Sequence, residues 1–146
     1  MLAVVEFLAT LSSTLFAGAA IYINLVEHPA RMSCDTKTAA MQWAPSYKRA
    51  TIMQASLAIA GFLTGVAAWL LGGGRSWLMG AVLLGAVVPF TFMAIMPTNH
   101  TLQEPGRDLS SPETRALLEK WGGLHAVRSL LSFLASLVFI WLLVVT

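Results

Sequence analysis

Charged residues are scarce in this chain. Only 11% of its 146 residues are Asp, Glu, Lys or Arg, whereas 57% are hydrophobic and the mean hydropathy is +0.73. A soluble domain typically carries about 25% charged residues, so this composition does not supply a surface for contact with water. The net charge is only +2 and the basic residues form no single stripe, which argues against nucleic-acid binding. The composition predicts an integral membrane protein.

Cysteine is almost absent, and basic residues are missing near the N-terminus. Cys34 is the single cysteine, so an intrachain disulfide is excluded. No Lys or Arg precedes the first apolar run, where the acidic Glu6 lies instead. A secretory signal peptide begins with a basic region. We therefore expect the first apolar run to remain in the protein as a membrane helix.

Four apolar stretches approach the length of about 20 residues that a helix needs to cross the hydrocarbon core. The spans are expected at residues 5–26, 50–71, 76–96 and 124–146, and polar loops at 27–49 and 97–123. The segment GGGR, Gly72 to Arg75, predicts a tight turn between the second and third spans. A lone strand would leave its backbone unpaired in lipid, so only helices suit these lengths. We predict an all-α fold, a four-helix membrane bundle forming one domain over residues 1–146.

Both long loops lie at one membrane face, because an even number of crossings separates them. That face carries eight of the nine basic residues, and only Arg75 lies at the other. Loops rich in Lys and Arg tend to stay in the cytoplasm. We therefore expect cytoplasmic long loops, in a protein of the bacterial inner membrane.

Two segments of the long loops carry helix signals. In SSPETR, Ser111 suits an N-cap and Pro112 suits the first helical position. This helix is expected to follow the membrane surface until the chain re-enters at Gly122–Gly123. The segment TAAMQWAPSYKRA predicts a short helix that breaks near Pro45.

Two signals lie inside the spans. Pro89 is expected to kink the third span. The segment GFLTG, Gly61 to Gly65, has the spacing of small residues at which membrane helices approach closely. Packing within the bundle is the preferred interpretation of this spacing, and a homo-oligomer is the alternative.

All three histidines fall at the face of the long loops. His28 ends the first span, His100 follows the third, and His125 opens the fourth. Asn24 lies four residues before His28, so the two share a helical face. Arg128 lies within the fourth span, where an ionisable group is costly and usually faces the bundle interior or a cavity.

Aromatic and amide side chains are expected at the same membrane face as the histidines and Arg128. Trp43, Tyr47 and Gln54 follow near-helical spacing into the second span, and Trp121 lies four residues before His125. Together they would form a pocket with flat walls between facing helices, a common place for sites in bundles. The alternative is that the Trp and Tyr rings anchor the helices at the membrane surface.

Two kinds of chemistry fit these residues. Three imidazoles (His28, His100 and His125) with one open position suit Zn, Cu or Fe, although no compact ligand motif is present. The other chemistry requires no cofactor. His125 or His28 takes a proton from an acidic carbon, and Arg128 with Asn24 or Asn99 stabilises the resulting oxyanion. The residues alone do not decide between the two.

Four segments, HPARM, WAPSYKRATIMQA, MPTN and WGGLHAVRSLL, resemble the anthrone oxygenase-like family of small four-helix membrane proteins. Many members of that family are domains of unknown function. The resemblance extends over most of the chain. The matching positions are His28, Pro29, Arg31, Trp43, Pro45, Ser46, Tyr47, Lys48, Arg49, Pro97, Asn99, Trp121, His125 and Arg128. His100 matches less well.

The resemblance implies a membrane oxygenase that oxidises a lipophilic anthrone- or quinol-like substrate with O2, either without a cofactor or with Cu, Fe or Zn. The expected catalytic residues are His28, His125, Arg128, Asn24 and Asn99. The expected substrate contacts are Trp43, Tyr47, Trp121 and Arg31, and Arg31 has the alternative role of a topology signal. A different class also fits, a non-catalytic membrane subunit or binder of a small molecule or metal whose polar face docks a partner. A transporter is disfavoured, because only Arg128 brings charge into the membrane interior.

Overall fold

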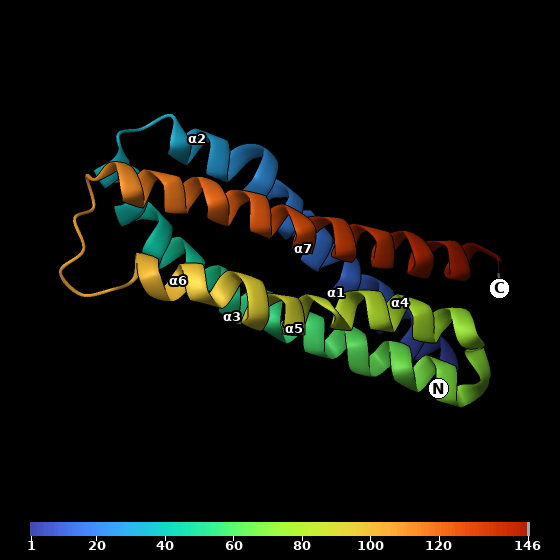
Figure 1. Ribbon diagram of the computed structural model, residues 1–146. Coiled ribbons are helices and arrows are strands. Elements are labelled where there is room, and N and C mark those ends of the chain that lie inside the picture. Colours follow the sequence, from blue (N-terminus) through green and yellow to red (C-terminus); the bar gives the residue numbers. More distant parts are fainter. Residues whose placement is uncertain (146) are drawn as a thin grey trace.

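The computed structural model describes residues 1–145, which are helical with short connections and contain no strand (Figure 1). The helical elements in chain order are α1 (Leu2–Tyr22), η1 (Ile23–Glu27), α2 (His28–Met32), α3 (Thr36–Ala68), η2 (Trp69–Gly73), α4 (Arg75–Gly85), α5 (Val87–Phe90), η3 (Thr91–Ile95), α6 (Met96–Leu102) and α7 (Pro112–Val145). The η elements are single π-helical segments.

These elements join into four continuous helical stretches that are long and apolar enough to cross a membrane. They are Leu2–Met32, Thr36–Gly73, Arg75–Leu102 and Pro112–Val145. Many of their large apolar side chains are exposed, as expected for a surface that faces lipid. The predicted all-α membrane bundle is confirmed. The sidedness of the loops and a bacterial inner membrane stay predictions.

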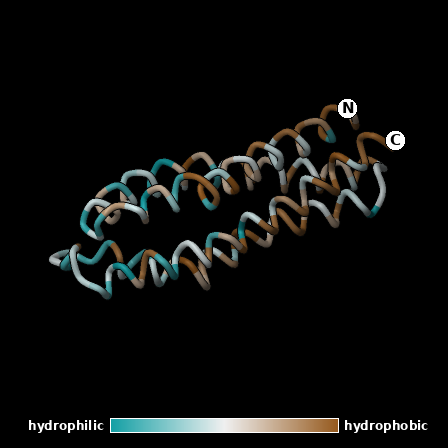
Figure 2. Tube along the Cα trace, turned by 90° about the horizontal axis from the view of Figure 1, so that it is seen from above, coloured by the Kyte–Doolittle hydropathy of each residue, from teal (hydrophilic) through white to brown (hydrophobic). Residues whose placement is uncertain are grey.

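The four stretches form a ring of neighbours. α1 packs against α3 and α7, and α4 packs against the same two helices from the other side. Both termini lie at the end of the bundle where η2 turns into α4, which we call the turn end (Figure 1). The connections α2–α3 and α6–α7 lie at the opposite end, the loop end. Hydrophilic residues gather at the loop end and hydrophobic residues toward the turn end (Figure 2).

The helices extend well beyond the expected spans. Most of residues 27–49 and 97–123 is helical, so the expected long loops are largely the polar ends of membrane helices. α3 runs through Pro45 without a break. Pro45 is exposed at the loop end, where the carbonyl that loses its partner can meet water. The predicted break near Pro45 is therefore wrong.

α7 is also one continuous helix. Ser111 caps it, because its Oγ accepts a hydrogen bond from the Thr114 backbone N–H at 3.1 Å. The predicted re-entry at Gly122–Gly123 is wrong. A Cβ at Gly122 would lie 2.5 Å from His28 Nε2, so this glycine allows a close approach between helices.

The remaining local predictions are confirmed. Gly72 and Gly74 have φ of 99° and 94° in the turn that joins the second and third stretches. A Cβ at Gly65 would meet Ala81 and Phe139, so the small residues of GFLTG pack inside the bundle. The third stretch is interrupted at Ala86, three residues before Pro89, and continues through α5 and the π-helical η3.

Candidate active site

Asn24 lies at the centre of the polar side chains of the loop end. It belongs to η1, and π-helical segments often occur at functional sites. Its Nδ2 donates to the Gly122 carbonyl at 3.0 Å. Its Oδ1 faces His125 Nδ1 at 2.7 Å and accepts from Ser129 Oγ at 2.5 Å. The amide therefore ties the first helical stretch to two successive turns of α7.

The orientation of Asn24 assigns the tautomer of His125. Because the Asn24 amide nitrogen donates to a carbonyl, the Asn24 amide oxygen faces the His125 ring. This oxygen can only accept, so His125 Nδ1 must be the donor. The Nε2 of the neutral ring then carries the lone pair. No hydrogen bond joins this nitrogen to another group within residues 1–145. His125 is 1% exposed and stacks on Trp121, with ring centroids 4.9 Å apart. The fold thus holds a neutral imidazole that is shielded from water and keeps one ring nitrogen free.

A small cavity lies beside His125. We call it the inner cavity, and its volume of about 10 Å³ is roughly enough for one water molecule. The residues that line it come from η1, α3 and α7. They are Ile23, Ser46, Tyr47, Ala50, Thr51, Gln54, Trp121, His125 and Arg128.

Arg128 brings an uncompensated positive charge to this cavity. Its Nη2 donates to Gln54 Oε1 at 2.8 Å, and its guanidinium lies 5.6 Å from the centre of the Phe16 ring. No carboxylate within residues 1–145 pairs with it. Arg128 Nε and Gln54 Nε2 are buried and have no hydrogen-bond partner. A buried cation without an anion is costly, and two idle donors beside it favour an oxygen anion as ligand.

A second polar network closes the loop end above the inner cavity. Arg31 Nη2 pairs with Glu27 Oε1 at 2.5 Å, and Arg31 also donates to Gln42 and to His28 Nδ1. Ser46, which lines the inner cavity, donates to the same Glu27 carboxylate. The Trp121 ring links this network to the site, because its centroid lies 5.3 Å from that of His28 and 4.9 Å from that of His125.

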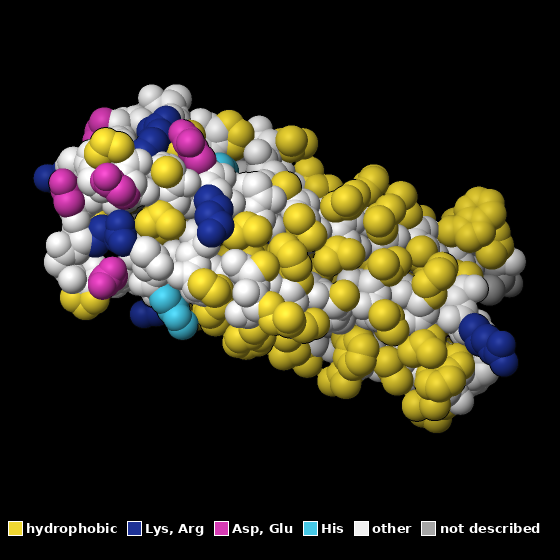
Figure 3. Space-filling model, viewed as in Figure 1, with side chains coloured by type: hydrophobic (Ala, Val, Ile, Leu, Met, Phe, Trp, Pro, Cys, Tyr) yellow, Lys and Arg dark blue, Asp and Glu magenta, His cyan; other side chains and the backbone are white. Residues whose placement is uncertain are grey.

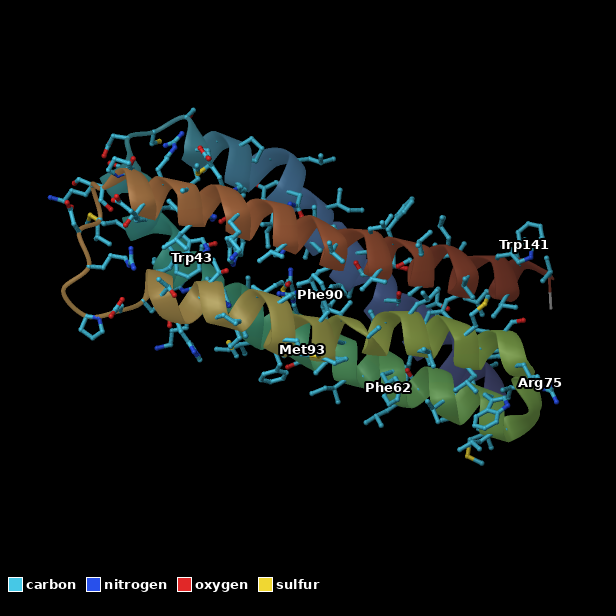
Figure 4. All side chains as sticks on the ribbon, viewed as in Figure 1. Trp43, Phe62, Arg75, Phe90, Met93 and Trp141 are labelled. Carbon is cyan, nitrogen blue, oxygen red and sulfur yellow. The ribbon has the colours of Figure 1, made fainter. Side chains whose placement is uncertain are left out.

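The aromatic predictions divide into two groups. Tyr47 and Trp121 line the inner cavity. Trp43 does not, because it lies behind them, stacked on Tyr47 at 5.1 Å and edge-on to Trp121 at 5.9 Å. Figure 4 shows Trp43 inside the bundle near the loop end. Arg31 pairs with Glu27 and donates to Gln42, and its expected contact with a substrate stays a prediction.

The structure does not bring the three histidines together. His100 is exposed, whereas the adjacent Asn99 is 1% exposed. Consecutive residues of a helix point about 100° apart, so α6 can turn only one of the two inward. Within residues 1–145 no three His, Cys, Asp or Glu side chains are grouped so that they could hold a metal ion. The ligand set expected from His28, His100 and His125 is therefore not assembled.

Asn99 is buried but does not line the inner cavity. It shares a face of α6 and η3 with Ile95 and Leu102, which belong to the same hydrophobic cluster as Trp43 and Trp121. Both polar atoms of its side chain lack a partner. The role expected for Asn99, a donor to an oxyanion, stays a prediction, and Gln54 is the amide that lines the inner cavity.

Sequence reasoning placed Gln54 in the pocket without a chemical role, and it did not single out Ser129. The signal for Gln54 was present, because it is a lone amide in the apolar second span. Ser129 lies one turn beyond His125, so it can reach the group that holds the imidazole. Neither signal shows which atoms meet, because that depends on how the helices are rotated.

The chain is similar to known proteins. The family model described as anthrone oxygenase matches residues 43–138. An anthrone oxygenase of Claviceps purpurea (strain 20.1) is 28% identical over 142 residues, which cover 87% of this chain and 81% of that protein. The anthrone oxygenase tpcL of Aspergillus fumigatus is 29% identical over 140 residues, covering 88% and 86%. No solved structure matches the chain.

Proposed function

Since the chain belongs to the anthrone oxygenase family, we propose that it oxidises a lipophilic anthrone-like phenolic ketone with O2 beside the inner cavity. One observation carries the proposal. His125, Arg128 and Gln54 line the same cavity, and Arg128 Nε and Gln54 Nε2 are buried N–H donors without a partner. A base and an oxyanion holder are the two groups that ionisation of a ketone requires.

The first step is removal of a proton. An anthrone has a CH2 group opposite its carbonyl, activated by two aromatic rings. His125 Nε2 takes one of these protons, and the electron pair moves through the ring to the carbonyl oxygen. Arg128 Nε and Gln54 Nε2 donate to the oxyanion that forms. In a site shielded from water such donors stabilise developing charge far more than they would in water.

The second step uses O2. The carbanion carbon bonds one oxygen atom, and the proton held by His125 returns to the other, which gives a hydroperoxide. Loss of water from the hydroperoxide leaves a second carbonyl. One anthrone and one O2 thus give one anthraquinone and one water, and the imidazole regains its neutral form.

The walls suit a flat aromatic substrate. Tyr47 and Trp121 present rings to the cavity, and aromatic faces stack on fused rings. Asn24 contacts no substrate in this scheme. It positions His125 by holding Nδ1–H, so that Nε2 remains the acceptor.

The test is oxidation of dithranol, a dihydroxyanthrone, by protein in lipid nanodiscs. O2 uptake and formation of the anthraquinone danthron are measured above the protein-free rate. His125→Ala should lose about 10² to 10⁴ of the rate, the usual contribution of proton transfer by a side chain. His100→Ala, which changes an exposed histidine, is the matched control and should behave as the parent protein.

Equal rates in the His125→Ala variant and the parent protein would overturn this assignment. A well-folded parent protein that oxidises neither anthrones nor quinols, and that copurifies with another membrane protein, would instead indicate a non-catalytic subunit.

A further inference from the structure

The third helical stretch separates from α3 halfway along its length. α4 packs along α3, but η3 and α6 pack against α7 instead. The packing partner of the third stretch changes near Pro89. Pro89 has no N–H to donate to the carbonyl four residues earlier, which belongs to Gly85, and α4 ends at Gly85. A seam therefore opens between α3 and η3 on the surface that faces lipid.

A second cavity fills this seam. We call it the outer cavity, and its volume is about 100 Å³. Phe92 lies at its rim and is 62% exposed, and Thr91 lines it as well. Four residues, Tyr47, Thr51, Gln54 and Arg128, line both the outer and the inner cavity. The two cavities thus meet at a common wall that contains the buried donors.

The inner cavity alone is small for a ligand. Pockets for small molecules typically measure about 300 to 1,000 Å³, and both cavities are well below that range. A molecule of three fused rings must therefore occupy both cavities and widen the seam between α3 and η3. Its oxygen would meet Arg128 and Gln54, which are 7% and 1% exposed.

The loop end carries a larger hollow of about 660 Å³, lined by Ala44, Pro45, Tyr47, Lys48, Thr51, Ile52 and Gln103. Neither Arg128 nor Gln54 lines this hollow, so it does not reach the buried donors. Arg31 is 5% exposed and Trp43 is 1% exposed, and Ser46, which lines the inner cavity, donates to Glu27. The polar groups gather around that end (Figure 3), whereas the rim of the seam is apolar. Met93, next to Phe92, points away from the bundle toward lipid (Figure 4).

We propose that the seam between α3 and η3 is the entrance through which a lipophilic ligand passes directly from the bilayer to Arg128 and Gln54. The ligand class is a flat aromatic molecule with an acceptor or anionic oxygen. The identity of this ligand rests on the proposed function, whereas the route rests on the two cavities and their shared wall.

The test measures how fast danthron binds to protein in lipid nanodiscs, by stopped-flow quenching of tryptophan fluorescence. Thr91→Trp places a bulky ring in the outer cavity and should slow association about tenfold. Phe92→Ala shortens a rim side chain and should leave association as fast as in the parent protein or faster. Leu130→Trp, at a lipid-facing position of α7 that is 57% exposed, is the matched control and should bind at the parent rate.

The outcomes separate the entrance from the chemistry. The entrance is supported if danthron associates more slowly with Thr91→Trp than with Leu130→Trp, and no more slowly with Phe92→Ala than with the parent protein. This holds whether or not dithranol is oxidised. Equal association rates for Thr91→Trp and Leu130→Trp overturn the entrance, and the proposed function stands if dithranol is still oxidised. Absence of saturable danthron binding to the parent protein also overturns the entrance. Slowed association without any dithranol oxidation by the parent protein contradicts the proposed function alone.

Discussion

The two ends of this bundle are built from the same four helices but are stabilised in different ways. At the turn end, Trp77, Ala81 and Phe139 are fully buried in one hydrophobic cluster, and the Phe139 ring fills the space that Gly65 and Gly80 leave open. At the loop end, His125 and Arg128 are buried together, and several of the polar atoms around them have no partner.

The contrast between the two ends indicates that the turn end serves mainly to stabilise the fold, whereas the loop end serves mainly to bind a ligand. Close packing of small residues against rings stabilises helices in lipid, where apolar burial alone gives little preference. Unpartnered polar groups destabilise the protein. Within residues 1–145, Trp77 Nε1 is the one such buried atom at the turn end, whereas six lie toward the loop end, and this concentration requires another reason. A ligand that forms hydrogen bonds with these polar groups would explain their retention. Substitutions at one end of the bundle should therefore leave the properties of the other end unchanged.

After His125→Ala, the largest effect is expected from Arg128→Met at the loop end. It removes the buried cation and one donor, so dithranol oxidation should fall about 10² to 10³-fold, as for loss of an oxyanion donor. Stability should hold or rise, because an unpaired buried charge is removed. Turnover and thermal unfolding of the same preparation measure both. A variant with full turnover would remove Arg128 from the site.

The next effect is expected from Gly80→Ala at the turn end. The added Cβ would overlap the Phe139 ring, and overpacking of a core typically costs about 1–3 kcal/mol. Unfolding in detergent should therefore occur at a lower temperature, with unchanged turnover per folded molecule. Gly18→Ala is the matched control, because a Cβ there meets nothing within 4 Å. Equal stabilities of the two variants would contradict the close packing of this end.

A smaller effect is expected from Asn24→Ala. Without the Asn24 amide, His125 can take either tautomer, so turnover should fall roughly tenfold, less than the contribution of proton transfer itself. Ser129→Ala removes only the second donor to Asn24 Oδ1 and should cost less. Steady-state rates of the two variants test this order. A greater loss for Ser129→Ala would contradict the positioning role of Asn24.

The smallest effect concerns the start of α3. The Thr38 side chain and backbone N–H donate to the Asp35 carboxylate, and these hydrogen bonds lower the pKa of Asp35. The ionised Asp35 therefore stabilises the folded protein fully above its unfolded-state pKa. This contribution to the free energy of unfolding is lost as the pH falls through the folded-state pKa of Asp35.

Asp35→Ala should slightly lower the melting temperature at neutral pH, and the difference from the parent protein should vanish in acid. Asp35→Asn keeps a capping side chain and should lack this pH dependence. Melting curves across the acidic range provide the measurement. The same pH dependence in both variants would show that another group titrates.

The sequence predicts the spans and the end of the bundle at which each residue lies, because hydropathy and the number of crossings determine both. It does not predict which side chains meet, because that depends on how each helix is rotated about its axis. Length and apolarity locate the four spans, and an even number of crossings brings His28, His125 and Arg128 to one end. The rotation of α6 places Asn99 inward and His100 outward, which spacing alone does not reveal. Gly122 was expected to break a helix, whereas it allows His28 to approach α7. The contact between Asn24 and His125 depends on the π-helical η1, for which no sequence signal was found.

The central claim, ionisation of the substrate by His125 beside Arg128, can be tested without turnover. Dithranol is mixed with the nanodisc protein in the absence of O2, and the absorption band of its anion is recorded. The account predicts one bound anion per folded protein near neutral pH, and none with His125→Ala or Arg128→Met. An anion band of full strength in both variants, or oxidation of dithranol by a parent protein that forms no anion, would contradict it.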